Sequence, residues 1–206
     1  MLLGGTLYSS KASADDCWFN IQPAFNTSKQ HVTVRLEGGS QLTDRLSLYG
    51  FSDVDATPEK SFDLKNFYIE TRLSYALTPK SNWAAILEYN GGNGMQDILR
   101  TGFTVTGSLG KGNFTKLKVL LFETSGAAGP QVALFTSQRL TDKLSARLGI
   151  DYNVEPRTIY YEPELDYMLN PRATLFLQGR SFGLIKDRIR LDPILGLKYN
   201  LSKTTS

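Results

Sequence analysis

Apolar and polar residues alternate along most of this chain, in stretches of about ten residues separated by short segments rich in Gly, Pro, Asn, Asp and Ser. Residues 144–154 place Leu, Ala, Leu, Ile, Tyr and Val at every second position, and residues 67–77 and 188–200 show the same period. A period of two over this length is typical of a β-strand with two different faces, because a helix repeats every 3.6 residues. We therefore expect an all-β protein.

A leucine followed by turn-forming residues recurs about every 31 residues, as a repeat of one structural unit would. The occurrences begin at Leu42, Leu77, Leu109, Leu140, Leu169 and Leu201. Within each unit lies one further break, at residues 26–30, 52–61, 90–94, 125–130, 153–157 or 183–187. Each unit then holds two extended segments of about 10 to 13 residues, the length of a tilted membrane strand. The pattern predicts about twelve strands in up-and-down order, with both termini at the short turns.

The ends of the apolar faces carry aromatic residues, which are enriched in membrane barrels at the two membrane–water interfaces. One group lies beside the short turns: Tyr75, Trp83, Tyr167 and Tyr199. A second group lies beside the other breaks: Tyr89, Tyr152 and Tyr161. Since every backbone polar group must be paired in hydrocarbon, such a sheet must close on itself. We expect a closed, antiparallel transmembrane β-barrel with its apolar face toward lipid.

The opposite face carries mixed charges, which a wet lumen tolerates and a dry core does not. Twelve strands leave a narrow aqueous route. The predicted pore-lining residues are Arg35, Glu37, Tyr49, Tyr68, Glu70, Arg72, Glu88, Arg100, Lys116, Lys118, Arg147, Glu162, Glu164, Arg180 and Arg190.

Counting from the turns predicts which charges meet. Arg72 falls opposite Glu88, and Glu162 falls close to Arg147 on one side and Arg180 on the other. A second group is left without an obvious acidic neighbour and is expected to form a basic patch: Arg100, Lys116 and Lys118. The lumen residues are either solvated without solute preference or favour small polar or anionic solutes.

Two features fit the strand pattern less well. Pro23, Pro163 and Pro193 fall inside expected strands, where each removes a ladder donor and requires a bulge or an interfacial position. Residues 120–122 and 132–135 are apolar without alternation, as in a buried strand of a soluble protein.

Composition excludes several other classes. With 41% hydrophobic and 21% charged residues the chain is not disordered, and its net charge of +3 includes no basic cluster for nucleic acid. No run approaches the roughly 20 apolar residues of a spanning helix. A single cysteine, Cys17, and a single histidine, His31, predict neither a disulfide nor a metal site, and nothing predicts a cofactor.

Catalytic residues are not expected either. His31 is the only histidine available as a base, and it lies at a strand start beside a turn. Glu162 and Glu164 share one strand face, whereas a glycosidase pair must face each other across the substrate. We expect a protein that is not an enzyme.

Residues 1–14 end in small residues at Ala12 and Ala14, which resembles a signal-peptidase site, although the apolar part is short and no basic residue precedes it. The segment is either a truncated signal segment or a flexible tail. Residues 15–206 are expected to form one barrel domain.

The overall pattern resembles bacterial outer-membrane barrels. Residues 48–53, Leu-Tyr-Gly-Phe-Ser-Asp, and 67–74, Phe-Tyr-Ile-Glu-Thr-Arg-Leu-Ser, are similar to the nucleoside-specific channel family, whose members are twelve-stranded. This resemblance implies a passive pore for nucleoside-like solutes. It does not assign that family's solute-contacting aromatic residues to positions of this chain. Tyr49 and Tyr68 face the predicted lumen and are the first residues to test.

Three functions of different class follow. The first is a passive, porin-like channel of the bacterial outer membrane for small polar solutes, anionic or nucleoside-like ones among them. The second is an outer-membrane barrel with an occluded lumen and a structural or interaction role. The third is a soluble β-barrel binding protein. The expected partners are the lipid bilayer and small polar solutes, not nucleic acid, and the oligomeric state stays open.

Overall fold

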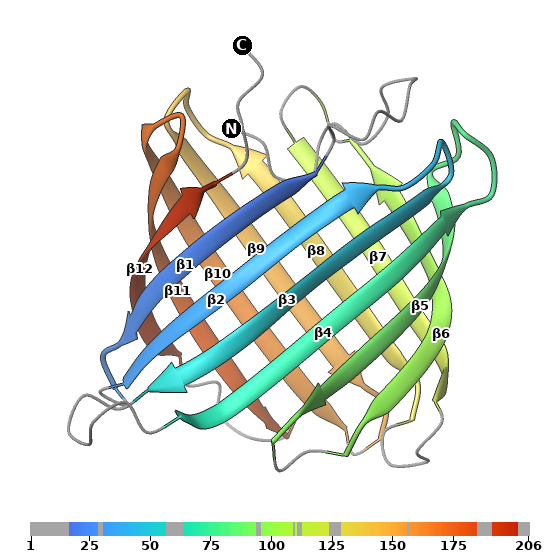
Figure 1. Cartoon of the computed structure of the whole chain (residues 1–206), viewed down its shortest axis with the longest axis horizontal. Helices are drawn as coiled ribbons and strands as arrows, with labels where there is room; N and C mark the ends of the chain where they lie inside the picture. Colours follow the sequence, from blue (N-terminus) through green and yellow to red (C-terminus); the bar gives the residue numbers. More distant parts are fainter. Residues whose placement is uncertain are drawn as a thin grey trace.

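The described residues of the chain form twelve antiparallel strands that close into one barrel in the computed structural model (Figure 1). The structure describes residues 17–28, 31–56, 64–93, 96–108, 110, 113–123, 129–155, 157–184 and 191–201. The strands are β1 (Trp18–Asn26), β2 (His31–Gln41), β3 (Leu46–Ala56), β4 (Leu64–Ala76), β5 (Trp83–Gly92), β6 (Ile98–Gly107), β7 (Asn113–Glu123), β8 (Gln131–Arg139), β9 (Leu144–Asn153), β10 (Thr158–Asn170), β11 (Ala173–Leu184) and β12 (Asp192–Asn200). The predicted all-β, up-and-down barrel is confirmed.

Closure comes from the pairing of β1 with β12. Asn20 pairs with Asn200 and Asn26 with Ile194, so the first and last strands share one antiparallel ladder. Every other strand pairs with its two neighbours in sequence. The strands are 9 to 13 residues long and cross the barrel at a steep tilt in Figure 1. No strand keeps an open edge, which is what a sheet in hydrocarbon requires.

Short turns explain the leucine repeat. In the β2–β3 turn, Thr43 Oγ1 accepts hydrogen bonds from the amides of Arg45 (3.2 Å) and Leu46 (3.0 Å). In the β8–β9 turn, Thr141 Oγ1 accepts the two equivalent amides at 3.2 and 3.0 Å. Asn170 Oδ1 does the same for two amides of the β10–β11 turn, both at 2.9 Å. A short polar side chain thus satisfies two turn amides in each of these three hairpins.

The two faces of the sheet differ as the alternation predicts. Side chains on the outer face are apolar and exposed, among them Phe25, Leu48, Leu87, Leu134, Leu165, Leu177 and Leu195. Side chains on the inner face are polar and buried, among them Asn20, Glu37, Glu70, Glu88, Thr104, Glu164 and Lys198. This distribution is the reverse of that in a soluble protein, and it suits a barrel surrounded by acyl chains.

Both predicted aromatic groups point outward. Tyr75, Trp83 and Tyr167 are about half exposed beside the short turns. At the other end, Tyr152 pairs with Ile159 and Tyr161 with Ile150, which places them on the same outer face. Two belts of aromatic residues, one near each end of a lipid-facing wall, are typical of the two interfaces of a bilayer.

Pro23 and Pro163 interrupt ladders without the expected bulge, whereas Pro193 is the second residue of β12, near the strand end, as expected. The β1–β12 ladder omits Pro23, and the register on either side of it is unchanged. The β10–β11 ladder likewise omits Pro163. Pro193 lies beside the end of β1, where its carbonyl oxygen accepts a hydrogen bond from the Thr27 amide at 3.1 Å. Pro23 and Pro163 therefore each leave a ladder without a donor on one side, while the ladder on the other side stays continuous.

Two boundaries differ from the sequence prediction. Residues 52–56 belong to β3 and not to a loop: Asp53 and Asp55 face inward, and Ser52, Val54 and Ala56 lie on the outer face. The apolar run at residues 120–122 is a β-bulge: Gly102 pairs with Leu120 and Thr101 with Phe122. Leu120 therefore faces inward, while Phe122 is 72% exposed on the outside.

Parts of the prediction lie outside the described residues. These are residues 1–14, the start of the domain at residue 15, and Arg190. No helix within the described residues is long and apolar enough to cross a membrane.

The lipid-facing assignment predicts that the cost of a charge depends on depth. Leu134 lies in the middle of β8 and Gln138 near its end, both on the outer face. We expect Leu134→Arg to lower the free energy of unfolding by about 2–4 kcal/mol and the control Gln138→Arg by about 0–1 kcal/mol. Urea unfolding of the barrel in liposomes measures both. Equal losses at the two positions would contradict a membrane-spanning β8.

Candidate functional site: the barrel lumen

The inner face of the wall carries fourteen of the fifteen predicted pore-lining residues, and the remaining one, Arg190, lies outside the described part of the chain. The alternation of β2, β3, β4, β5, β6, β7, β9, β10 and β11 places on the inner face Arg35, Glu37, Tyr49, Tyr68, Glu70, Arg72, Glu88, Arg100, Lys116, Lys118, Arg147, Glu162, Glu164 and Arg180. The pairing of the strands thus gathers side chains from distant parts of the sequence into one polar interior.

Glu88 is the centre of the first charge cluster. It is only 1% exposed, and its carboxylate is 2.7 Å from Arg72 Nη2 and 3.1 Å from Lys118 Nζ. Asn90 donates a further hydrogen bond to it at 3.2 Å. Arg72 also pairs with Glu70 at 2.6 Å. The predicted opposition of Arg72 and Glu88 is therefore present, and a buried carboxylate is balanced by two cations.

The second cluster joins β9, β10 and β12. Arg147 pairs with Glu164 and, at 2.7 Å, with Asp166, and Lys198 pairs with the same two carboxylates. The expected contact of Arg147 with Glu162 is wrong, because the register puts Arg147 opposite Glu164. Glu162 does lie near Arg180, at 3.7 Å.

The expected basic patch does not form as a group. Lys118 pairs with Glu88 and lies 4.0 Å from Asp151, so it has the acidic neighbours that the sequence did not reveal. Arg100 donates a hydrogen bond to the side chain of Gln131 at 3.3 Å. Lys116 makes no ion pair with any described residue. The prediction for Lys118 failed because its long side chain extends from β7 across β6 to β5. Counting residues from a turn predicts only contacts between the two strands of one hairpin.

Sequence reasoning missed several inner residues. The sequence predicts a loop at Asp53, but this residue lies in β3 and accepts two hydrogen bonds of 2.7 Å each from Arg35. Gln22, Phe176 and Lys198 also face inward and were not among the predicted site residues. Their position in the alternation was a usable signal, although two of the three carry no charge.

Four aromatic rings form a row on the inner wall of β1, β3 and β4. The ring centroids of Trp18 and Tyr49 are 6.0 Å apart, those of Tyr49 and Phe51 6.2 Å, and those of Phe51 and Tyr68 5.5 Å. Trp18 reaches Tyr49 across β2 because Gly39 leaves room: a Cβ there would lie 2.9 Å from the indole nitrogen. We call these four residues the aromatic row.

Two arginines lie over this row. The guanidinium carbon of Arg35 is 4.3 Å from the centroid of Phe51, and that of Arg72 is 5.6 Å from the centroid of Tyr49. Both distances allow a cation–π attraction. The row is therefore both apolar and close to charge, as in sites that stack flat, polar molecules.

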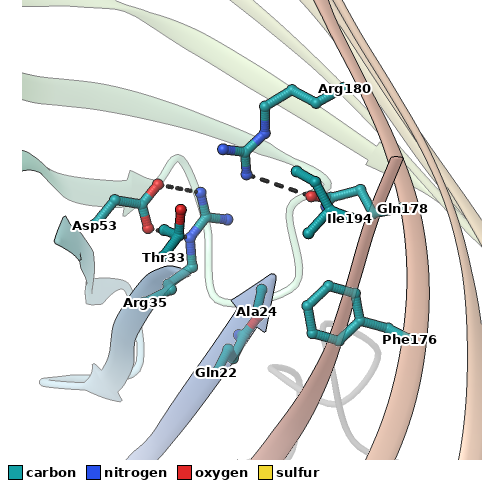
Figure 2. A pocket seen from close by; sticks show the side chains of 9 residues that line it. All are labelled: Gln22, Ala24, Thr33, Arg35, Asp53, Phe176, Gln178, Arg180 and Ile194. Atoms are coloured by element: carbon teal, nitrogen blue, oxygen red, sulfur yellow. Dashed lines mark hydrogen bonds and ion pairs between the residues drawn. The ribbon is translucent and has the colours of Figure 1, made fainter. Parts of the chain in front are cut away.

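A pocket opens inside the wall where β12 meets β1. Figure 2 shows its side chains, which come from β1, β2, β3, β11 and β12. The cavity among these side chains has a volume of about 20 Å³, room for about one water molecule. The residues that shape it are Gln22, Ala24, Arg35, Phe176, Arg180 and Ile194. We call it the seam pocket, because it lies at the strand pair that closes the barrel.

His31 does not alter the expectation that the protein is not an enzyme. Its Nε2 is 3.7 Å from Asp55 Oδ1, and the same Asp55 oxygen accepts a hydrogen bond of 2.6 Å from Thr33. The hydroxyl beside this pair is therefore bound to the carboxylate rather than to the imidazole, unlike an activated nucleophile. Among the described residues, no group of three or more His, Cys, Asp or Glu side chains forms a metal site.

Comparison with known proteins gives fold similarity alone. No family model and no curated protein matches the chain. Among solved structures, the KdgM porin aligns with a TM-score of 0.62 at 10% identity, over 88% of this chain and 98% of that one. The fold is that of an outer-membrane β-barrel. The outward-facing apolar surface agrees with it, and together they support the predicted location in a bacterial outer membrane.

Two further structures have this fold. The NanC porin aligns with a TM-score of 0.61 at 8% identity, over 90% of this chain and 99% of that one. Outer membrane phospholipase A from Escherichia coli aligns with a TM-score of 0.61 at 13% identity, over 92% and 91%. The KdgM porin is also described in complex with disordered oligogalacturonate. Channels and an enzyme thus share one architecture, and the fold does not choose between them.

The burial of Glu88 predicts that its ion pairs stabilise the wall. We expect Glu88→Gln to lower the free energy of unfolding by about 3 kcal/mol, because it leaves Arg72 and Lys118 without their shared carboxylate. The exposed pair Arg139–Asp142, at 2.7 Å, is the control, and Asp142→Asn should cost less than about 1 kcal/mol.

A double-mutant cycle identifies the interaction itself. Glu88→Gln combined with Lys118→Gln should cost less than the sum of the two single variants by about 0.5–3 kcal/mol. Additive losses in urea unfolding would show that the two side chains do not act on each other.

Proposed function

We propose that the protein is a passive, porin-like channel that carries small polar solutes across a bacterial outer membrane. The observation that carries the proposal is the division of one closed wall into an apolar outside and a charged inside. A soluble binding protein needs the opposite arrangement. The KdgM and NanC porins support the proposal by sharing the fold.

The passage is narrow. Inner side chains from several strands are almost fully buried, among them Glu88, Asp166 and Lys198. The close packing of these side chains limits a passing molecule to a small size unless their ion pairs separate. They also favour the second candidate, a barrel whose lumen is occluded and whose role is structural.

The charge balance favours uncharged solutes over anions. On the inner faces of the described strands the acidic side chains are Glu37, Asp53, Asp55, Glu70, Glu88, Glu123, Asp151, Glu162, Glu164, Asp166 and Asp192. The basic ones are Arg35, Arg72, Arg100, Lys116, Lys118, Arg139, Arg147, Arg180 and Lys198. Acidic groups outnumber basic ones, so the lumen has no surplus of positive charge to attract a polyanion such as oligogalacturonate.

Nucleoside-like solutes are the finer proposal, and the aromatic row supports it. A base has a flat face that can stack on Tyr49 or Phe51, and the adjacent Glu37 and Asn90 can accept or donate hydrogen bonds to a ribose. The row runs across three strands, so a solute would contact successive rings as it moves.

Conductance in planar bilayers separates the channel from the occluded barrel. We expect the purified protein to give discrete current steps in KCl, with a weak preference for cations because acidic side chains predominate. The reversal potential in a KCl gradient gives the sign of that preference. Folded protein without current steps would support the occluded barrel, with heat-modifiable migration on a gel as the check of folding.

Current block by uridine tests the aromatic row. We expect Tyr49→Leu to weaken block by uridine about fivefold or more, since stacking on an aromatic ring contributes about 1–3 kcal/mol per base. Phe103→Leu is the control, because Phe103 stacks on Trp83 at 5.7 Å on the lipid side. If uridine blocks the current of the Tyr49→Leu and Phe103→Leu variants equally, the aromatic row does not bind the base.

A further inference from the structure

An open groove crosses the lipid-facing side of the wall over β4, β5, β6 and β7. Its volume of about 470 Å³ is within the range of ordinary ligand sites. In one row across the strands, the small Ala85 lies between Tyr75 and Phe103. In the next row, Thr101 lies beside Leu87. Short side chains next to long ones thus leave a hollow in the apolar outer face.

The groove begins at the short-turn end of the barrel and leads into the depth of the membrane. Tyr75 is the second-last residue of β4, beside the turn to β5. Because the strands are tilted (Figure 1), the row that starts there passes Ala85 and Phe103 and reaches Val119 in the middle of β7. Three strand spacings of about 4.8 Å make a path of about 14 Å, close to half of the roughly 30 Å hydrocarbon core. One acyl chain of a lipid fits a path of this length and direction.

The turn end of the groove carries positive charge. Arg45 Nη1 donates a hydrogen bond to the hydroxyl oxygen of Tyr75 at 3.4 Å, so this guanidinium lies at the edge of the groove. Lys80 is exposed in the turn between β4 and β5. Neither cation forms an ion pair with a residue in the described part of the chain, Asp44 included. The remaining N–H groups of Arg45 can therefore donate to an anion at this membrane interface.

Basic residues recur around this end of the barrel. The leucine repeat places one in each of four described short turns: Arg45, Lys80, Lys143 and Arg172. Basic side chains beside a membrane attract the headgroups of anionic lipids. At the groove, this positive collar adjoins a hollow that can hold an acyl chain, so charge and shape favour the same molecule.

We propose that the groove binds one glycerophospholipid with a net negative headgroup, taken from the leaflet on the short-turn side. The phosphate accepts hydrogen bonds from Arg45 and lies near Lys80, and one acyl chain lies along Ala85 and Thr101. Tyr75 marks the boundary between the two parts, with its hydroxyl at the headgroup and its ring against the chain. The proposal needs the membrane location alone, and it holds whether or not the lumen conducts.

Native mass spectrometry of the purified barrel in a non-ionic detergent tests the site. Titration with phosphatidylglycerol gives the affinity of the first lipid that stays bound. Phosphatidylcholine with the same acyl chains is the reference, because its headgroup has no net charge. We expect the first phosphatidylglycerol to bind about tenfold more tightly than phosphatidylcholine, since two cations lie near its phosphate.

Four variants separate the headgroup from the chain. Arg45→Gln should weaken the first phosphatidylglycerol about fivefold and leave phosphatidylcholine unchanged. Lys143→Gln in the β8–β9 turn is its control and should leave the first site unchanged. Ala85→Leu fills the hollow and should weaken the first site for both lipids, whereas Ala146→Leu on the outer face of β9 should not. Thr101→Leu fills the same hollow from β6 and serves if Ala85→Leu does not fold.

The outcomes decide the site independently of the channel. Losses confined to Arg45→Gln and to the filling variants, with heat-modifiable migration intact, would support it even without current steps. Equal affinity for the two lipids would overturn it. Equal losses in Arg45→Gln and Lys143→Gln would also overturn it, because binding would then follow the charge of the whole collar. A dimer that Ala85→Leu separates would show a second copy of the chain in the groove in place of a lipid.

Discussion

The structure depends on one constraint, which is that hydrocarbon offers no partner for a backbone amide or carbonyl. A sheet of twelve strands meets this constraint only when its first and last strands pair, and β1 and β12 do so from Asn20 to Asn26. Proline is tolerated in such a wall only where a ladder can lack one donor. Pro23 and Pro163 interrupt their ladders without shifting the register, so closure survives both of them.

Closure creates an interior that must hold the charges of the inner faces. Those charges are arranged in clusters that span more than one hairpin: Glu88 of β5 holds Arg72 of β4 and Lys118 of β7, and Glu164 holds Arg147 and Lys198. The same contacts brace the wall and reduce the space for a solute. Permeability and stability are therefore linked in this barrel, and the aromatic row is where the inner surface offers groups beyond ion pairs.

Counting from the turns predicted the contact of Arg72 with Glu88, because the two residues belong to one hairpin whose short turn sets the register. The same method failed for Arg147. The pairing of Thr158 with Asn153 sets the register of β9 and β10, and it brings Glu164 rather than Glu162 opposite Arg147. It also failed for Lys118, which crosses β6 over the small residues Gly102 and Thr104 to reach Glu88. Hairpin counting does not extend to strands that are not neighbours.

The sequence by itself determined the number of strands, their order, the face that most strand residues take and the positions of the aromatic groups, because these follow from a period of two and from local turn chemistry. Only the tertiary structure decided the partners of Lys118 and Arg147, the strand position of Asp53 and the existence of the seam pocket. Those features depend on how far a side chain reaches across a curved wall and on where a glycine such as Gly39 or Gly196 leaves room for a ring. Curvature and closure are properties of the whole sheet, so no local pattern contains them.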